Sequence, residues 1–384
     1  MEKIQGINPQ RIAWCQKERR LTLEQLSVEV DVALETLQRV MKGKDALSAG
    51  QLGKLGKYFN RGMLFFLDEN PVNEKKLHSP QFRSITNQKP DIASKLTALV
   101  ERIEKHRQVY ISLLEDLGED VDREWHPAKI TSDIGNIKQT ADTVRDWLGL
   151  TDNIDFSEMR RAVEGKGIMV FLSNGYKGQW QIDKKDPIRG FSLYYPRFPV
   201  ITIKKQRSEG AQAFTMMHEL GHLLFHRDSF VDDDKDFYSY QGKEKVANEF
   251  AGSVLVPDRF MEQVNFRNFP MEDIVGYDGY LKEYCQRWCV STEVILRRML
   301  NKRLMTQKNY QGYRKWKKSQ PRPEQGSGAR YRYKEPVRVF GEPFVRTVLD
   351  ALHNKHITLA KASSYLDNLK IKDLRRLEET NVRI

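Results

Sequence analysis

One five-residue motif, His-Glu-Leu-Gly-His at positions 218–222, constrains this chain more than any other feature of its sequence. On an α-helix, imidazoles at positions i and i+4 project from the same face, where both can bind one zinc ion. The carboxylate of Glu219 then stands where it can take a proton from a water molecule at the metal. Apolar residues on both sides, such as Phe214 and Leu224, predict that the helix is buried. The motif therefore predicts a zinc-dependent hydrolase.

A catalytic zinc site needs a third protein ligand besides His218 and His222, and it keeps one position open. The acidic residues that follow the motif fall into two groups. Four aspartates lie in a polar segment, which predicts a loop without a helix to hold them. Two glutamates lie in a segment whose apolar positions predict a buried helix face. These candidates are Asp232, Asp233, Asp234 and Asp236, and then Glu244 and Glu249.

Within the predicted helix, the sequence favours Glu244 as the third zinc ligand. Glu244 and Asn248 are one turn apart, so a carboxylate on the metal and an amide bonded to a ligand histidine could share one face. Glu249 lies well round the helix and remains the alternative ligand. His226 lies one turn beyond His222, but three successive histidines of one helix would not all reach the same tetrahedral metal site. We therefore interpret His226 as a residue packed beside the site or on the surface.

Three short strands precede the zinc helix. Residues 168–171, 190–194 and 200–203 are rich in β-branched and aromatic residues, and they are separated by turn signals. This order predicts an α+β domain in which a small sheet leads into the metal-bearing helix. An extended peptide could add to the edge of such a sheet beside the metal. Tyr194, Tyr195 and His226 are candidate oxyanion donors.

The first 70 residues predict an all-α bundle that contains a helix-turn-helix. Two predicted helices, centred on Leu26 and Leu37, are separated only by residues 31–33. Asp31 occupies the turn, and Asp tolerates the left-handed conformation better than most residues. The second helix is expected to enter the major groove of duplex DNA. We expect Glu35, Thr36, Gln38 and Arg39 to face bases and Lys42 to contact phosphate. A helix-turn-helix used only for protein contacts is the alternative.

The remaining parts carry less chemical information. Residues 71–128 predict a polar linker and a long amphipathic helix, which is either an interdomain strut or a homodimerisation helix. Residues 301–340 combine an excess of Lys and Arg with Pro and Gly, which predicts a basic flexible linker. We expect this linker to add salt-sensitive affinity for nucleic acid, unless it is only a solvated tether. Residues 341–384 predict a small helical extension.

Composition agrees with an intracellular partner of nucleic acid. The net charge of +12 suits a polyanion, although charge alone is weak evidence. No apolar run is long enough to span a membrane, and the first residues lack a signal-peptide core. Three cysteines do not make a disulfide framework, and Cys285 and Cys289 are expected to be core or half-exposed thiols. We therefore expect a cytoplasmic protein.

Two segments resemble known families. The motif at 218–224, a second motif with Glu244, Asn248 and Phe250, and Leu255-Val256-Pro257 together resemble the ImmA/IrrE metallopeptidases. Residues 21–43 resemble an XRE-type repressor helix-turn-helix. Residues 65–68 with 82–84 resemble the joint seen where the two modules are fused. Two departures are Val246, in place of a second acidic residue, and Met41, in place of a charged residue.

The resemblance implies a zincin-like metallopeptidase fold for 129–300, zinc bound by His218, His222 and Glu244, and Glu219 as general base. It also implies a stress- or prophage-linked transcription regulator, because similar peptidases cleave helix-turn-helix repressors. Two alternatives remain. The peptidase domain could be a sensor or scaffold with little activity, or the chain could be an antitoxin-like or defence-system component that binds a partner protein.

Overall fold

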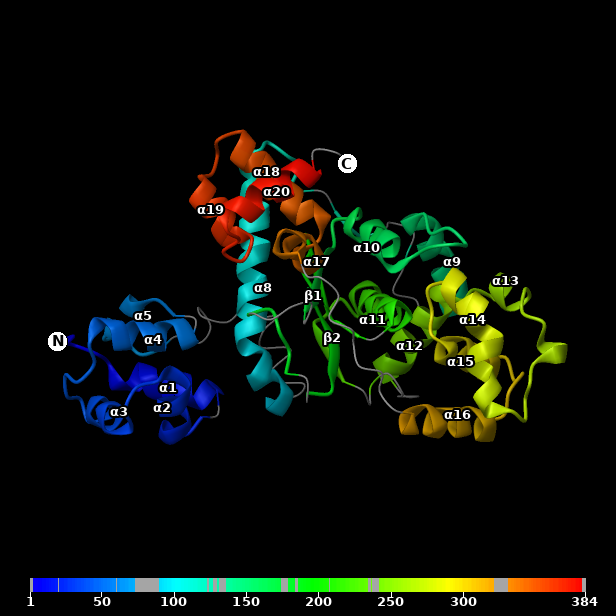
Figure 1. Ribbon diagram of the computed structural model, residues 1–384, viewed down its shortest axis with the longest axis horizontal. Coiled ribbons are helices and arrows are strands. Elements are labelled where there is room, and N and C mark those ends of the chain that lie inside the picture. The colour runs from blue at the N-terminus through cyan, green and yellow to red at the C-terminus, as the bar shows by residue number, and fades with distance from the viewer. Residues whose placement is uncertain are drawn as a thin grey trace. The chain divides into compact units, whose positions relative to one another are not determined.

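A computed structural model shows a helix-rich chain with one small sheet (Figure 1). The structure describes residues 3–19, 21–59, 61–72, 90–122, 124–126, 130, 136–173, 179–183, 186–206, 208–233, 236, 242–320 and 331–381. Asp234, the joint predicted at 82–84 and the part of the basic segment at 321–330 lie outside these residues. The chain divides into two compact units, Met1–Ile103 and Glu104–Ile384.

The first unit is the predicted bundle of short helices: α1 (Pro9–Arg19), α2 (Leu23–Val30), α3 (Leu34–Met41), α4 (Ala49–Phe59) and α5 (Met63–Leu67). Helix α2 begins with a capping box, in which Thr22 and Gln25 each accept a hydrogen bond from the other's backbone N–H. It ends at Asp31, which adopts the predicted left-handed conformation with φ of 48°. Leu26, Leu37 and Leu52 are among the fully buried residues of a continuous apolar core.

The sheet of the second unit has four strands: β1 (Met169–Ser173), β2 (Ile188–Leu193), β3 (Val200–Lys204) and β4 (Phe230–Asp233). Their order is β1-β3-β2-β4; β1 is parallel to β3, whereas β2 is antiparallel to both β3 and β4. The first three are the predicted strands, and the small sheet in the middle of the chain is confirmed. The prediction of a polar loop at Asp232 and Asp233 is wrong, because both residues are buried and belong to β4.

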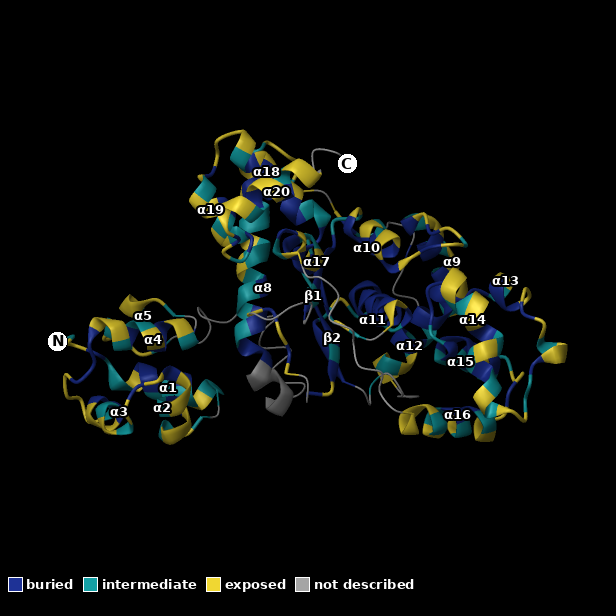
Figure 2. Ribbon diagram, in the orientation of Figure 1, coloured by how far each residue is buried: buried dark blue, intermediate teal, exposed yellow. Residues whose placement is uncertain are grey.

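Helix α11 (Glu209–Gly221) packs on β2 and β3 and is buried along its length (Figure 2). Helix α12 (Gly242–Leu255) packs against α11, and α9 (Ile137–Leu148) packs against α12. Four more helices complete this side of the unit: α10 (Phe156–Glu164), α13 (Asp258–Met261), α14 (Tyr277–Arg287) and α15 (Thr292–Asn301). The core of the unit therefore surrounds the helix that carries the zinc motif.

The long amphipathic helix predicted after residue 90 is α8 (Pro90–Asp116). The boundary between the two units falls within it, after Ile103. In the second unit, His106 of α8 stacks on Phe340 with ring centroids 5.1 Å apart, and Tyr110 contacts Phe344. These partners come from α17 (Glu335–Phe340) and α18 (Glu342–His353), which are followed by α19 (Leu359–Tyr365) and α20 (Ile371–Asn381). The predicted C-terminal helices thus pack on the second unit, and α17 also packs on β1.

The prediction of a flexible linker over 301–340 is wrong for most of its length. Residues Gln307–Ser319 form helix α16, which Thr306 caps by accepting a hydrogen bond from the N–H of Asn309. Tyr310 and Tyr313 are buried in the core, and the hydroxyl of Tyr313 donates to Asp278 over 2.7 Å. The basic side chains of this segment therefore stand on an ordered helix.

Candidate metal centre

Helix α11 places two histidines of the motif in the interior. Ser208 caps the helix by accepting a hydrogen bond from the N–H of Ala211, and the last turn continues into a π-helical turn, His222–His226. A Cβ atom at Gly221 would lie 2.9 Å from Cδ1 of Phe250, so this glycine allows α12 to approach α11 closely. The close approach brings Glu244, in the first turn of α12, to the histidines.

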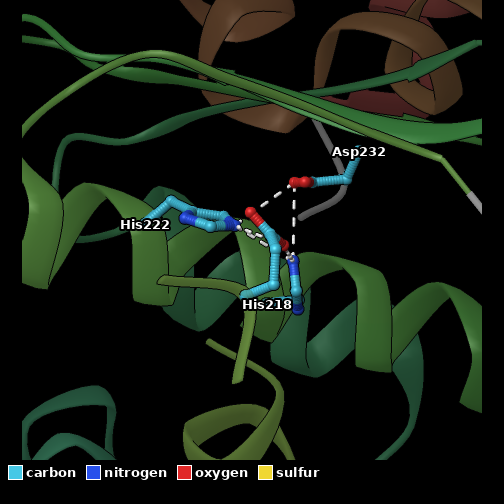
Figure 3. Close-up of side chains that lie close together, drawn as sticks. His218, His222 and Asp232 are labelled. Carbon is cyan, nitrogen blue, oxygen red and sulfur yellow. Dashed lines mark hydrogen bonds and ion pairs between the residues drawn. The ribbon is translucent and has the colours of Figure 1, made fainter. Parts of the chain in front are cut away.

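Four side chains meet at one point: His218 and His222 of α11 and its extension, Asp232 of β4 and Glu244 of α12. Figure 3 shows the two imidazoles and the Asp232 carboxylate turned toward one another. The two Nε2 atoms are 3.0 Å apart. Oε2 of Glu244 lies 3.3 Å and 3.5 Å from them, and Oδ2 of Asp232 lies 3.5 Å and 3.4 Å from them.

The four distances between a carboxylate oxygen and an Nε2 atom match the edges of a tetrahedron around a metal ion, whereas the two Nε2 atoms are closer together than such an edge. Bonds of about 2.0–2.2 Å from zinc to nitrogen and oxygen place tetrahedral ligand atoms about 3.3–3.6 Å apart. Oδ2 of Asp232 and Oε2 of Glu244 are buried and have no hydrogen-bond partner, so both are available to a cation. Two imidazoles with two carboxylates are also a donor set that zinc accepts. The residues present therefore fit a metal ion.

The charges within the cluster shift the pKa values of its members in opposite directions. Burial alone would raise the pKa of Asp232, but the neighbouring His222 and His218 lower it well below its usual range. Burial alone would lower the pKa of His222, but Asp232 and Glu244 raise it to about 9. The carboxylates thus favour their charged forms, which are the forms that bind metal.

Glu219 is completely buried next to this cluster. Burial and then the nearby Asp232 carboxylate raise the pKa of Glu219 well above its usual range. Neither of its carboxylate oxygens has a hydrogen-bond partner. A buried carboxylate beside a cluster of metal-ligating side chains stands where it can take up and release a proton during a reaction at the metal.

The other candidates occupy different positions. His226 lies beside the site, and its Nδ1 is 2.9 Å from Nδ1 of His222. Burial, followed by the charge of His222, lowers the pKa of His226 to about 4, so a neutral His226 can accept a hydrogen bond from the N–H at Nδ1 of His222. The hydroxyl of Tyr195 donates to Glu104, and the structure does not bring it to the cluster.

Asn248 and Glu249, which lie on α12 with Glu244, are not members of the cluster. The side-chain amide of Asn248 donates to the backbone carbonyl of Asp236 over 2.9 Å, rather than making the predicted bond to a ligand histidine. Glu249 lies toward Arg298: burial lowers the pKa of Arg298, and the carboxylates of Asp258 and Glu249 act against that shift. Of the two glutamates, the cluster contains Glu244.

The sequence places Asp232 among the candidate ligands but favours Glu244 over it, because aspartates in a polar stretch predict a loop. In the structure Asp232 is 1% exposed. The available signal was Phe230-Val231, an aromatic and a β-branched residue directly before the aspartates, which is the composition of a short strand.

The residues predicted to contact DNA lie on α3 and its C-terminal cap. Glu35, Gln38, Arg39 and Lys42 are exposed, and Thr36 is half-buried. The apolar face of α3 is formed by Leu37 and Val40, which are buried in the bundle. The structure therefore leaves the predicted contact face open to solvent.

Comparisons with known proteins identify the second unit's central segment. Residues 164–300 match the IrrE N-terminal-like domain of the peptidase M78 family, which confirms the predicted resemblance. A relative, the uncharacterized immunity region protein 2 of Bacillus phage phi105, is 30% identical over 94 residues. That match covers 24% of this chain and spans 60% of the relative's length. A Mycobacterium tuberculosis transcriptional regulator of known structure is 16% identical, with 50% of each chain covered and a TM-score of 0.29.

No helix within the described residues is both long enough and apolar enough to cross a membrane.

Proposed function

We propose that this chain, whose residues 164–300 are an IrrE N-terminal-like domain of the peptidase M78 family, is a zinc-dependent endopeptidase that regulates transcription. The observation that carries the proposal is the cluster of His218, His222 and Glu244 beside a buried Glu219. An i, i+4 histidine pair explains metal binding, but a purely structural site does not require the carboxylate of Glu219.

In this proposal His218, His222 and Glu244 hold the ion. A zinc ion at this position would polarise the scissile carbonyl and activate water for attack. Glu219 takes the proton of the attacking water and passes it to the leaving amine, and its raised pKa suits both steps. His226 fixes the orientation of the His222 ring through the 2.9 Å contact between their Nδ1 atoms.

The regulatory part of the proposal rests on the N-terminal unit. Its α2–turn–α3 arrangement leaves a polar face of α3 exposed, and such a face can enter the major groove of duplex DNA. The phage relative is named as an immunity region protein, which favours a role in the control of repression. The proposed substrate is a repressor protein, itself of helix-turn-helix type, in the cytoplasm.

The test compares variants of the purified chain. Glu219→Gln keeps the shape of the side chain and removes the base, so it should retain one zinc per chain and lose cleavage of repressor proteins and of a quenched-fluorescence peptide library. His222→Ala should lose both zinc and cleavage. Glu249→Gln and His356→Ala are matched controls, because Glu249 lies outside the cluster and His356 is exposed.

Zinc content is measured by atomic emission and cleavage by mass spectrometry. If Glu219→Gln cleaves as fast as the wild type, the assignment of the base is wrong. If zinc binds but neither the wild type nor Asp232→Ala, which lacks the fourth side chain of the cluster, cleaves any substrate, the domain is a sensor or scaffold.

A further inference from the structure

We propose that Asp232 is a fourth protein ligand that closes the metal centre and holds the peptidase latent until this carboxylate leaves. The inference rests on the proposed metal site and adds to it a residue that the motif does not contain. Catalytic zinc sites have three protein ligands and an open position, whereas sites with four protein ligands are closed.

Asp232 lies as close to the two imidazoles as Glu244 does. Its Oδ2 lies 3.5 Å from Nε2 of His218 and 3.4 Å from Nε2 of His222, against 3.3 Å and 3.5 Å for Oε2 of Glu244. The four ligand atoms lie within 4.8 Å of one another. Each carboxylate thus lies as close to both imidazoles as a second ligand of the same ion would, and four protein ligands would leave no position for water or for a substrate carbonyl.

The negative charges of Asp232 and Glu244 also favour binding of both carboxylates to one ion. Imidazoles that bind a metal are neutral, so Asp232 and Glu244 then carry two negative charges, and the interior penalises such a pair unless a cation neutralises it. A divalent ion provides two positive charges. Asp232 is less exposed than Glu244, with side-chain exposures of 1% and 20%, so its charge depends more on a neutralising ion than the charge of Glu244 does.

The backbone around Asp232 holds it at the metal. Strand β4 lies at the end of the sheet order and pairs with β2, with an irregular register between Ile188 and Gly190. The N–H of Asp233 donates to the carboxylate of Asp236 over 2.8 Å, and the carbonyl of Asp236 accepts from Asn248 over 2.9 Å. This chain of bonds connects β4 to α12, one turn from Glu244.

Activation then requires a local change rather than a new site. If β4 shifts along β2, Oδ2 of Asp232 leaves the metal while His218, His222 and Glu244 stay on their helices. The edge of a sheet is also where an extended polypeptide can pair as an added strand. Pairing at β4 by an extended segment of the protein substrate would therefore act on the strand that carries the blocking carboxylate.

The experiment uses the full chain loaded with cobalt(II), whose visible absorption reports the coordination of the metal. Acetohydroxamate is the probe, because it binds a metal ion that has an open position. In the wild type, the spectrum should stay unchanged at probe concentrations that change the spectrum of Asp232→Ala. Glu249→Gln, which removes a carboxylate that lies outside the cluster, should behave as the wild type.

Cleavage gives the second readout. Asp232→Ala should hydrolyse the peptide library at least about tenfold faster than the wild type, and Asp232→Ala combined with Glu219→Gln should be inactive. If the alanine variant does not fold, Asp232→Asn replaces it, because it removes the charge and keeps the size of the side chain. Binding of one cobalt ion per chain shows that a variant retains the metal site.

The outcomes separate the two proposals. If acetohydroxamate changes the wild-type spectrum as readily as that of the Asp232 variants, the centre is open and Asp232 is not a fourth ligand, although the metal site stands. If neither the wild type nor the controls bind one metal ion per chain, the proposed function itself fails, and this inference fails with it.

Discussion

Gly190 of β2 lies directly against Glu219 of α11: a Cβ atom at position 190 would stand 2.7 Å from Oε1 of the glutamate. The same atom would lie 2.7 Å from Cγ2 of Thr215 and 3.0 Å from the carbonyl oxygen of Thr202. A strand interior usually disfavours glycine, so its presence here marks a close approach between a backbone and a functional side chain. The position of the proposed base therefore depends on a residue without a side chain in the neighbouring strand.

Gly190→Ala should disable the enzyme by displacing Glu219. Overpacking in a core costs about 1–3 kcal/mol, and here the Thr202 backbone cannot move away as a side-chain end can. We expect a lower free energy of unfolding in urea and strongly reduced cleavage, with zinc still bound. Gly279→Ala is the matched control, because Gly279 is exposed in α14 and has nothing near its Cβ position. Unchanged stability and activity in Gly190→Ala would contradict the assigned contact.

Removal of the metal should destabilise the second unit. The proposed ligands come from α11 with its extension, from β4 and from α12, so a bound ion would join the sheet to two helices. A ligand present at 100 times its dissociation constant stabilises the folded state by about 2.7 kcal/mol. Thermal melts with a chelator and with graded free zinc should show a melting temperature that rises with zinc. The shift should be absent in His222→Ala and present in His356→Ala; identical melts with and without zinc would contradict the site.

Local periodicity explains what could be predicted from the sequence. The i, i+4 spacing of His218 and His222 needs only helical geometry, and the three strands before them have strand composition. The left-handed turn at Asp31 followed from the short gap between two apolar helical repeats. None of these features depends on residues distant in the sequence.

The missed features depend on partners far along the chain. Asp232 has a loop-like sequence context, and it is buried because β4 pairs with β2 and because two imidazoles face its carboxylate. The sequence of helix α16 predicts a linker because charge dominates its composition. The signal was the spacing of Tyr310, Tyr313 and Trp316, which recur every third residue and place an aromatic stripe against the core.

Acid should weaken the contact between Asp258 and Arg298. Nη2 of the buried Arg298 donates to Oδ1 of Asp258 over 2.6 Å. Burial would raise the pKa of Asp258, but the hydrogen bond from Lys302 and the charge of Arg298 outweigh burial and lower it. A lowered folded-state pKa stabilises the fold above the ordinary value near 4, and this contribution is lost as the pH falls through the lower folded-state value.

The pH prediction is tested with Asp258→Asn. Urea unfolding should show the variant to be less stable than the wild type at pH 7. The difference should shrink as the pH falls below about 4, where the unfolded chain takes up the proton first, and through the lowered pKa of the folded state. A difference in stability that stays the same from pH 7 to pH 3 would show that the charge of Asp258 does not contribute.

Replacing Gln38 and Arg39 together with Ala should abolish sequence-specific DNA binding and leave the first unit folded. Both side chains are exposed on α3, whereas Leu37 and Val40 hold that helix in the core. Each bidentate contact between a side chain and a base contributes about 1–3 kcal/mol of discrimination, so losing two contacts removes most of the preference for one operator. Operators are selected from random duplexes with the wild-type chain, and binding is then measured by gel shift at fixed salt. Gln10→Ala with Lys57→Ala is the control, since it removes the same types of side chain from exposed positions on α1 and α4. An unchanged footprint in the α3 variant would show that this helix does not read the DNA.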